Sequence, residues 1–361
     1  MRRFRGCAIA VSTCIIATMG IVASSRAAAA VTPAPCGITI FPRYGTYVAS
    51  KRLLGPALML NGGGAPKDDL KAEWGWVHGK VLGNRPGRAG NFVVLRASYN
   101  NVYEKQFYDA GNFASVQTVL IPPCAPLRAV ERAVPVVDGA DMVFFAGGDQ
   151  ANYARWKGSA LVRAVRRVYA RGGAVGGGSA GLAIQGAAVY DSVSADRVGN
   201  DTHTADAVKY PLEPRISFTT GFFAWPPLAD TITDTHFAIR DRFGRSVVFL
   251  ARILHDGTLR DTGTAYALGV DQESVVLVDR NGIGTLLNGK PPGNLGAYLI
   301  RATAMPHLLR GSPIRYAVEV SHIARSGERF DLLHKTTSEP WYRVVVDGAK
   351  QPPYSRNPYK P

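Results

Sequence analysis

The stretch GGAVGGGSAGLAIQG, residues 172–186, determines how the rest of the chain is interpreted. It begins with a short apolar run typical of a buried strand and ends in residues that favour a helix, with Ser179 at the junction. Gly177, Ser179 and Gly181 satisfy the pattern G-x-S-x-G, which places a serine in a tight strand-to-helix turn. A flexible Gly/Ser linker and a phosphate-binding glycine loop are the alternatives, and the flanking sequence has to distinguish them.

Continuous apolar runs recur before this stretch, at residues 57–64, 91–97, 116–121 and 140–148. They do not alternate with polar residues, which is typical of strands buried on both faces of a parallel sheet. The segment that precedes residue 172 has Leu161, Val165 and Val168 at helical spacing, so strand, helix and strand form a crossover unit. The sequence therefore predicts an α/β fold, doubly wound, with a mostly parallel sheet, flanking helices and a nucleophile elbow. This context excludes a linker.

Four segments are predicted along the chain. Residues 1–30 have a basic start, an apolar core and small residues after it, as in a secretory signal. A membrane anchor is the alternative, but the apolar core is short for a bilayer span, so we expect cleavage. The mature protein is then exported to the periplasm or the extracellular space, with no membrane attachment. Residues 31–54 form an N-terminal extension, 55–302 the α/β catalytic domain, and 303–361 a small β-rich C-terminal appendage.

The composition suits a globular chain with a sizeable core, with 46% hydrophobic and 19% charged residues. The formal charge is +15, but lysines and arginines are scattered, so we interpret them as a solvated surface and expect no nucleic-acid partner. We find no metal-ligand cluster and no dinucleotide motif, and we expect no metal and no cofactor. Cys36 and Cys124 remain after signal removal. A disulfide between them is favoured over two buried free thiols.

A serine nucleophile needs a base, and the chain has seven histidines. His236 lies in ITDTHFAIRDRFGR, where three arginines follow it. Taken alone, a histidine near arginines is more often a surface residue. FFAGGDQ, residues 144–150, could likewise be a simple strand end.

Together, FFAGGDQ, GGGSAG and DTHFAIRDRFGR resemble, in this order, the motifs of the cyanophycinase and aspartyl-dipeptidase family of serine peptidases. LMLNGGG and ALGVDQESVVLV also fit that pattern, so the resemblance covers roughly residues 55–280. It implies a serine peptidase that hydrolyses aspartyl peptide bonds through an acyl-enzyme on Ser179, and the predicted signal would export this enzyme. Cyanophycin, a polymer of aspartyl-arginine units, or β-aspartyl peptides are the implied substrates. The alternatives are an α-aspartyl dipeptidase and a non-catalytic binding protein on the same scaffold.

The resemblance also implies roles for single residues. Ser179 matches the nucleophile and His236 the general base, while the backbone N–H groups of Gly148 and Ala180 match the oxyanion donors. Guanidinium groups would hold substrate carboxylates and an acid would hold a substrate guanidinium. We expect one arginine to bind substrate and another to pair with a local acid. The implied substrate-binding residues are Gln150, Asp234, Arg240, Arg242 and Arg245.

Three departures from the family pattern stand near the site. Gly178 replaces the usual threonine before the nucleophile, and Thr235 replaces the usual glutamine before the histidine. A long spacing places an insertion at residues 191–230. The third triad member is predicted to be Asp196, with Asp191 as second choice. The oligomeric state, monomer or homodimer, stays open.

Overall fold

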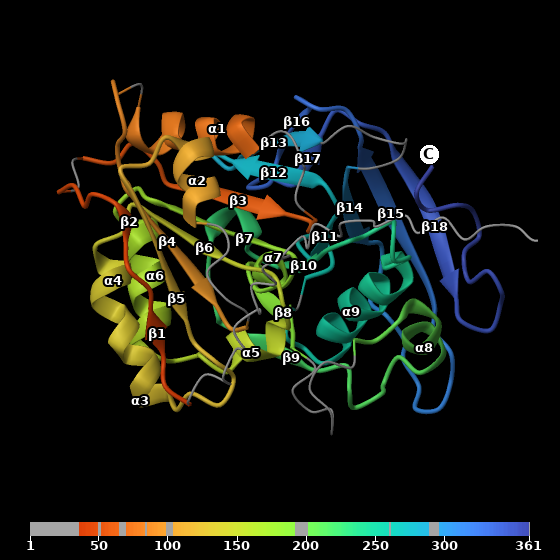
Figure 1. Ribbon diagram of the computed structural model, residues 1–361. Helices are drawn as coiled ribbons and strands as arrows, with labels where there is room; N and C mark the ends of the chain where they lie inside the picture. The colour runs from red at the N-terminus through yellow and green to blue at the C-terminus, as the bar shows by residue number, and fades with distance from the viewer. Residues whose placement is uncertain are drawn as a thin grey trace, which may run out of the picture. The chain divides into compact units, whose positions relative to one another are not determined.

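Two mixed β-sheets and the helices packed on them form the fold (Figure 1). The computed structural model describes residues 36–49, 52–64, 70–83, 85–98, 104–191, 201–259, 261–288 and 296–360. All of these belong to one compact unit, Pro35–Pro361. The predicted signal, residues 1–30, lies outside the described residues, and export stays a prediction.

The first sheet is built around five parallel strands. Its order is β1-β5-β4-β6-β7-β3-β12-β13-β16-β17, with β2 also paired to β5. The parallel strands are β5 (Ser115–Leu120), β4 (Asn91–Arg96), β6 (Met142–Phe145), β7 (Ala174–Gly178) and β3 (Ala57–Asn61). These are the apolar runs from which the strands were predicted.

Helices cover both faces of this parallel part (Figure 1). Side chains of one face, such as Met59, pack with α1 (Leu70–Leu82) and α2 (Glu104–Gly111). Leu58 and Leu60 belong to the core of the opposite face. The helices there are α3 (Leu127–Val130), α4 (Val134–Asp138) and α6 (Ala160–Ala170), with the 3-10 turn η1 (Glu131–Ala133). Burial on both sides explains why the strands are apolar without alternation.

The second sheet has the order β18-β15-β14-β11-β10-β8-β9. Its strands are β8 (Ala188–Tyr190), β9 (Phe218–Thr220), β10 (Thr231–Asp234), β11 (Tyr266–Val270), β14 (Ala297–Ala302), β15 (Arg315–Ile323) and β18 (Trp341–Asp347). The helix α9 (Phe243–His255) shares a buried cluster with these strands, and α8 (Thr204–Lys209) adds Ala207 and Val208 to it. Among the described strands of this sheet, β10 pairs in parallel with β8 and with β11, and the other pairs are antiparallel.

The prediction of a mostly parallel sheet is therefore wrong. The first sheet continues past β3 through antiparallel pairs. These strands are β12 (Ser274–Val278), β13 (Ile283–Asn288), β16 (Arg329–Asp331) and β17 (Thr336–Thr337). The connection from β12 to β13 is a short turn, which allows only an antiparallel hairpin. The C-terminal appendage and its boundary at residue 303 stay a prediction. Strands β15 and β18 beyond that residue belong to the second sheet, and β16 and β17 belong to the first.

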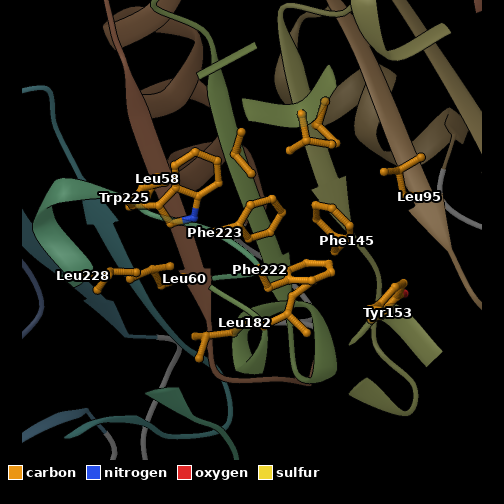
Figure 2. Close-up of a cluster of buried hydrophobic side chains, with 14 of the residues drawn as sticks. Leu58, Leu60, Leu95, Phe145, Tyr153, Leu182, Phe222, Phe223, Trp225 and Leu228 are labelled. Carbon is orange, nitrogen blue, oxygen red and sulfur yellow. The ribbon is translucent and has the colours of Figure 1, made fainter. Parts of the chain in front are cut away.

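An aromatic segment after β9 packs into the core (Figure 2). Phe222, Phe223 and Trp225 are at most 3% exposed, and Figure 2 shows the first two beside Phe145. The Trp225 indole donates to Gln185 Oε1 at 2.8 Å. This segment belongs to the insertion that the sequence places at residues 191–230. The 3-10 turn η2 (Pro226–Leu228) lies within this segment.

A disulfide joins Cys36 to Cys124, with the two Cα atoms 5.2 Å apart. It links the segment that leads into β1 (Thr39–Ile40) and β2 (Tyr44–Gly45) to the loop after β5. Both short strands also pair with β5, so this end of the chain is held by covalent and hydrogen bonds. Among the described residues, the helices are too short or too polar to cross a bilayer.

Candidate active site

Ser179 lies in a tight turn between β7 and the short helix α7 (Ala180–Ala183). Its backbone has φ 52° and ψ −116°, a conformation that L-residues rarely adopt. The chain passes so closely here that a Cβ on Gly177 would lie 2.3 Å from Gly181 backbone atoms. One on Gly181 would lie 2.0 Å from the Phe145 carbonyl oxygen. The glycines of the quoted stretch are therefore required by close backbone contact.

His236 lies next to this serine, although the two residues follow strands of different sheets. The distance from Ser179 Oγ to His236 Nε2 is 2.9 Å. His236 follows β10 in the second sheet, whereas Ser179 follows β7 in the first. The His236 amide donates to the Gly62 carbonyl at 2.8 Å, and a Cβ on Gly63 would lie 2.4 Å from Nε2. The glycine turn after β3 thus forms the wall against which the imidazole packs.

Gln272 holds the other ring nitrogen of His236. Its Oε1 lies 3.0 Å from Nδ1, in the turn that joins β11 to β12. An amide oxygen only accepts, so Nδ1 carries the proton and Nε2 is left to accept from the serine hydroxyl. The Glu273 amide donates to the Gly63 carbonyl at 2.8 Å and fixes this turn to the glycine wall. The signal in the sequence was ALGVDQESVVLV, which was cited for its fit to the family pattern without a role for Gln272.

Burial lowers the pKa of His236 to about 4, against the raising effect of its hydrogen bond with Gln272. The charges of Arg240 and Arg242 lower it further, while Asp234 raises it. The imidazole is therefore neutral at neutral pH, the state in which it can accept a proton. The serine and histidine predicted from the sequence are brought into direct contact.

The predicted third triad member is not tested, because Asp196 lies outside the described residues. The second choice, Asp191, accepts from the Ser217 hydroxyl at 2.6 Å and from the Thr219 hydroxyl. Among the described residues, the partner of His236 Nδ1 is Gln272.

A polar cavity of 210 Å³ opens on one side of Ser179. Several residues implied by the resemblance meet in it, including the two predicted oxyanion donors Gly148 and Ala180. Gly148 follows β6 and has φ 144°, and Asp149 caps α5 (Gln150–Ala154). The lining residues are Gly148, Asp149, Gln150, Ser179, Ala180, Asp201, Thr235, Arg240 and Arg242.

Two of the three arginines are held by acids. The Arg245 side chain is 3% exposed and contacts both oxygens of Asp234, with Nη2–Oδ1 at 2.6 Å and Nε–Oδ2 at 2.8 Å. Arg242 pairs with Asp201, as does Arg245 Nη1. Burial alone raises the pKa of Asp234, but the charge and hydrogen bonds of Arg245 hold it below its usual value. Asp234 and Arg245 therefore bind each other in the core and do not line the cavity.

Arg240 differs from its two neighbours. It is exposed and lines the polar cavity, and among the described residues it forms no salt bridge, whereas Arg242 pairs with Asp201 and Arg245 with Asp234. The sequence could not separate the three arginines, because spacing along the chain does not give their burial. Within the described ranges, no group of three or more metal-binding side chains is arranged around an ion site.

No protein-family model and no curated protein matches the chain. Among solved structures, the chain is similar to a peptidase from an acI-B1 actinobacterium, at 15% identity and a TM-score of 0.46, over 78% of this chain and 98% of that one. It is also similar to a putative Peptidase E protein from Listeria monocytogenes EGD-e, at 13% identity and a TM-score of 0.37, over 65% and 98% of the two chains. These structural neighbours are peptidases. Neither likeness is close enough to assign an activity to this chain.

Proposed function

We propose that this chain is a serine hydrolase that cleaves a peptide bond next to an aspartyl residue through an acyl-enzyme on Ser179. The observation that carries the proposal is the relay from Ser179 Oγ to His236 Nε2, 2.9 Å, and from His236 Nδ1 to Gln272 Oε1, 3.0 Å. A serine needs such a base to become a nucleophile. The strained turn and the neutral imidazole support the same function.

The chemistry follows from this arrangement. Ser179 Oγ attacks the substrate carbonyl carbon while His236 Nε2 takes the hydroxyl proton. The carbonyl oxygen becomes negative, and the N–H groups of Gly148 and Ala180, both lining the polar cavity, would donate to it. The C–N bond then breaks, and the leaving amine receives the proton from His236. Water repeats the sequence on the ester, which releases the acid and restores Ser179.

Gln272 acts as a positioning residue in this scheme. It fixes the tautomer and the orientation of His236, but it carries no charge to stabilise the imidazolium that forms. The site therefore differs from a Ser-His-Asp triad, in which a carboxylate binds Nδ1 of the histidine.

The polar cavity favours a substrate with a carboxylate. Arg240 offers an exposed guanidinium there, and Gln150 lines the same cavity. Asp234, expected to hold a substrate guanidinium, is paired with Arg245. This weakens the case for cyanophycin and favours an aspartyl dipeptide, either β- or α-linked. The aspartyl carboxylate that is not part of the scissile bond would then lie at Arg240.

A fluorophosphonate label followed by mass spectrometry tests the nucleophile. We expect the label on Ser179 in the wild-type chain, with none in Ser179→Ala. His236→Ala should abolish labelling, and His203→Ala is the matched control because His203 is exposed. Product analysis with a panel of aspartyl dipeptides then tests turnover. An unlabelled Ser179 together with tight dipeptide binding would instead favour the non-catalytic binding protein.

A further inference from the structure

A second cavity also borders Ser179, which is the one described residue that lines both cavities, and among the described residues its lining is uncharged. It measures 170 Å³. Among the described residues, it is lined by Asn61, Gly63, Gly64, Trp74, Gln106, Phe107, Phe144, Ala146, Gly147, Gly178 and Ser179. This set has no charged side chain, whereas the polar cavity has Asp149, Asp201, Arg240 and Arg242.

Three aromatic rings form the apolar part of this cavity. Trp74 of α1, Phe107 of α2 and Phe144 of β6 contact one another, with centroid separations of 4.9 Å, 5.5 Å and 5.8 Å. They are 1%, 5% and 6% exposed, so the surface they offer is set by the packing of the core. An apolar cavity of about 150 Å³ is enough to hold a benzene ring. The cavity beside Ser179 therefore has room for one phenyl or branched aliphatic group.

The position of His236 assigns this cavity to the leaving group. The leaving amine takes its proton from His236 Nε2. The leaving group must therefore lie in the cavity that adjoins this nitrogen. Gly63 lies against the Nε2 edge of the imidazole and lines the apolar cavity. The predicted oxyanion donors and Arg240 line the polar cavity instead. The aspartyl part of the substrate thus occupies the polar side and the amine part the apolar side.

We propose that the residue released from the substrate is apolar, with a phenyl or branched aliphatic side chain held by Trp74, Phe107 and Phe144. This inference rests on the proposed hydrolase function and names the substrate class of the same site. A cationic arginine side chain would be desolvated against these rings, and no described residue of the cavity lining offers it a carboxylate, which is unfavourable. The substrate class is therefore an aspartyl dipeptide with an apolar second residue.

Gly178 explains how the cavity stays open. A Cβ at this position would lie 3.4 Å from Phe144 Cζ and 3.8 Å from the Asn61 amide oxygen, which are ordinary contacts. A larger side chain at Gly178 is therefore compatible with the backbone but would project into the cavity. The departure from threonine noted in the sequence removes that obstruction.

Steady-state kinetics on β- and α-aspartyl dipeptides with Phe, Leu, Gly or Arg in second place test the inference. For the wild-type chain we expect kcat/KM for Phe or Leu to exceed that for Arg on the order of tenfold or more. Equal or better turnover of the Arg dipeptides would overturn the inference while leaving the hydrolase function intact.

Two variants probe the cavity directly. Gly178→Thr should lower kcat/KM for Phe more than for Gly, so the Phe-to-Gly ratio falls by roughly tenfold. Gln106→Glu places a carboxylate at the exposed rim and should raise the Arg-to-Phe ratio. Lys105→Gln is the matched control, because it makes the same change in net charge at the neighbouring exposed position outside the cavity lining. Unchanged ratios in both cavity variants would contradict the assignment.

Calorimetric binding to Ser179→Ala separates the two proposals. If the wild-type chain hydrolyses none of the dipeptides but Ser179→Ala binds the Phe dipeptide about tenfold tighter than the Arg one, the cavity assignment stands and hydrolysis does not. If Arg binds as tightly as Phe, or neither binds, the cavity assignment is wrong.

Discussion

Replacing Gln272 by glutamate changes one atom and should move the pH dependence of catalysis. Its Oε1 lies 3.0 Å from His236 Nδ1, so the variant puts a carboxylate against the imidazole. The wild-type pKa of His236 is about 4, because burial outweighs the hydrogen bond. An opposite charge at this distance raises a histidine pKa by about 1–3, which moves that of His236 to between about 5 and 7.

The direction in which kcat/KM changes with pH follows from the role of His236 as a base. Only the neutral imidazole accepts the serine proton, so kcat/KM falls as the pH drops through the pKa. The wild-type chain should therefore keep its activity down to about pH 4, while Gln272→Glu should lose it between about pH 7 and 5.

The assay is kcat/KM from pH 3.5 to 8 on one dipeptide, with NMR titration of the His236 ring protons. Gln351→Glu is the control, since it makes the same chemical change at an exposed position in the C-terminal tail. Gln272→Ala should lower kcat/KM by roughly 10–100-fold, as expected for losing a partner that orients an imidazole. An acid limb at the same pH in wild type and Gln272→Glu would refute the contact between Gln272 and His236.

Three further results are expected. Arg240→Gln should raise KM by roughly ten- to a hundredfold with kcat little changed, because Arg240 contacts the substrate carboxylate equally in the ground and transition states. An unaltered KM would show that Arg240 does not contact the substrate. Asp234→Asn should destabilise the chain by about 3–5 kcal/mol in urea denaturation, since it leaves Arg245 buried and underpaired; a loss below about 1 kcal/mol contradicts this. Thiol titration of the denatured chain without reductant should show neither Cys36 nor Cys124 free, and their reduction should cost at most about 4–5 kcal/mol for a loop of 88 residues.

The sequence predicted those parts of the site in which one short motif determines the geometry. Gly177 and Gly181 flank Ser179 because the backbone allows no Cβ at either position, and this requirement is visible in the sequence. The strands of the parallel sheet were found for a similar reason, since burial on both faces leaves mainly apolar residues in them, such as Leu58–Leu60 of β3 and Phe92–Leu95 of β4. His236 was identified from the motif around it.

The features that the sequence did not predict depend on contacts between distant segments of the chain. Gln272 reaches His236 from a turn 36 residues further on, and no local pattern marks an amide as a partner. Arg240 and Arg245 look alike in the sequence, yet one is exposed and the other lies against Asp234. The antiparallel extension of the first sheet was missed because strand order depends on long-range pairing, which periodicity does not encode.

The nucleophile and its base belong to different sheets, with Ser179 after β7 and His236 after β10. The 2.9 Å contact between them is therefore a measure of how the two sheets are docked. One buried cluster contains residues of both sheets, including Leu60 of β3 and Leu268 of β11, so the core that stabilises the fold also sets this distance. A displacement of one ångström between the sheets would break the proton relay. On heating, inactivation should precede the loss of secondary structure. The working lifetime of such a catalyst is then limited by the contact between the two sheets, so stabilising mutations in the buried cluster that they share should prolong activity more than those in the clusters that belong to one sheet.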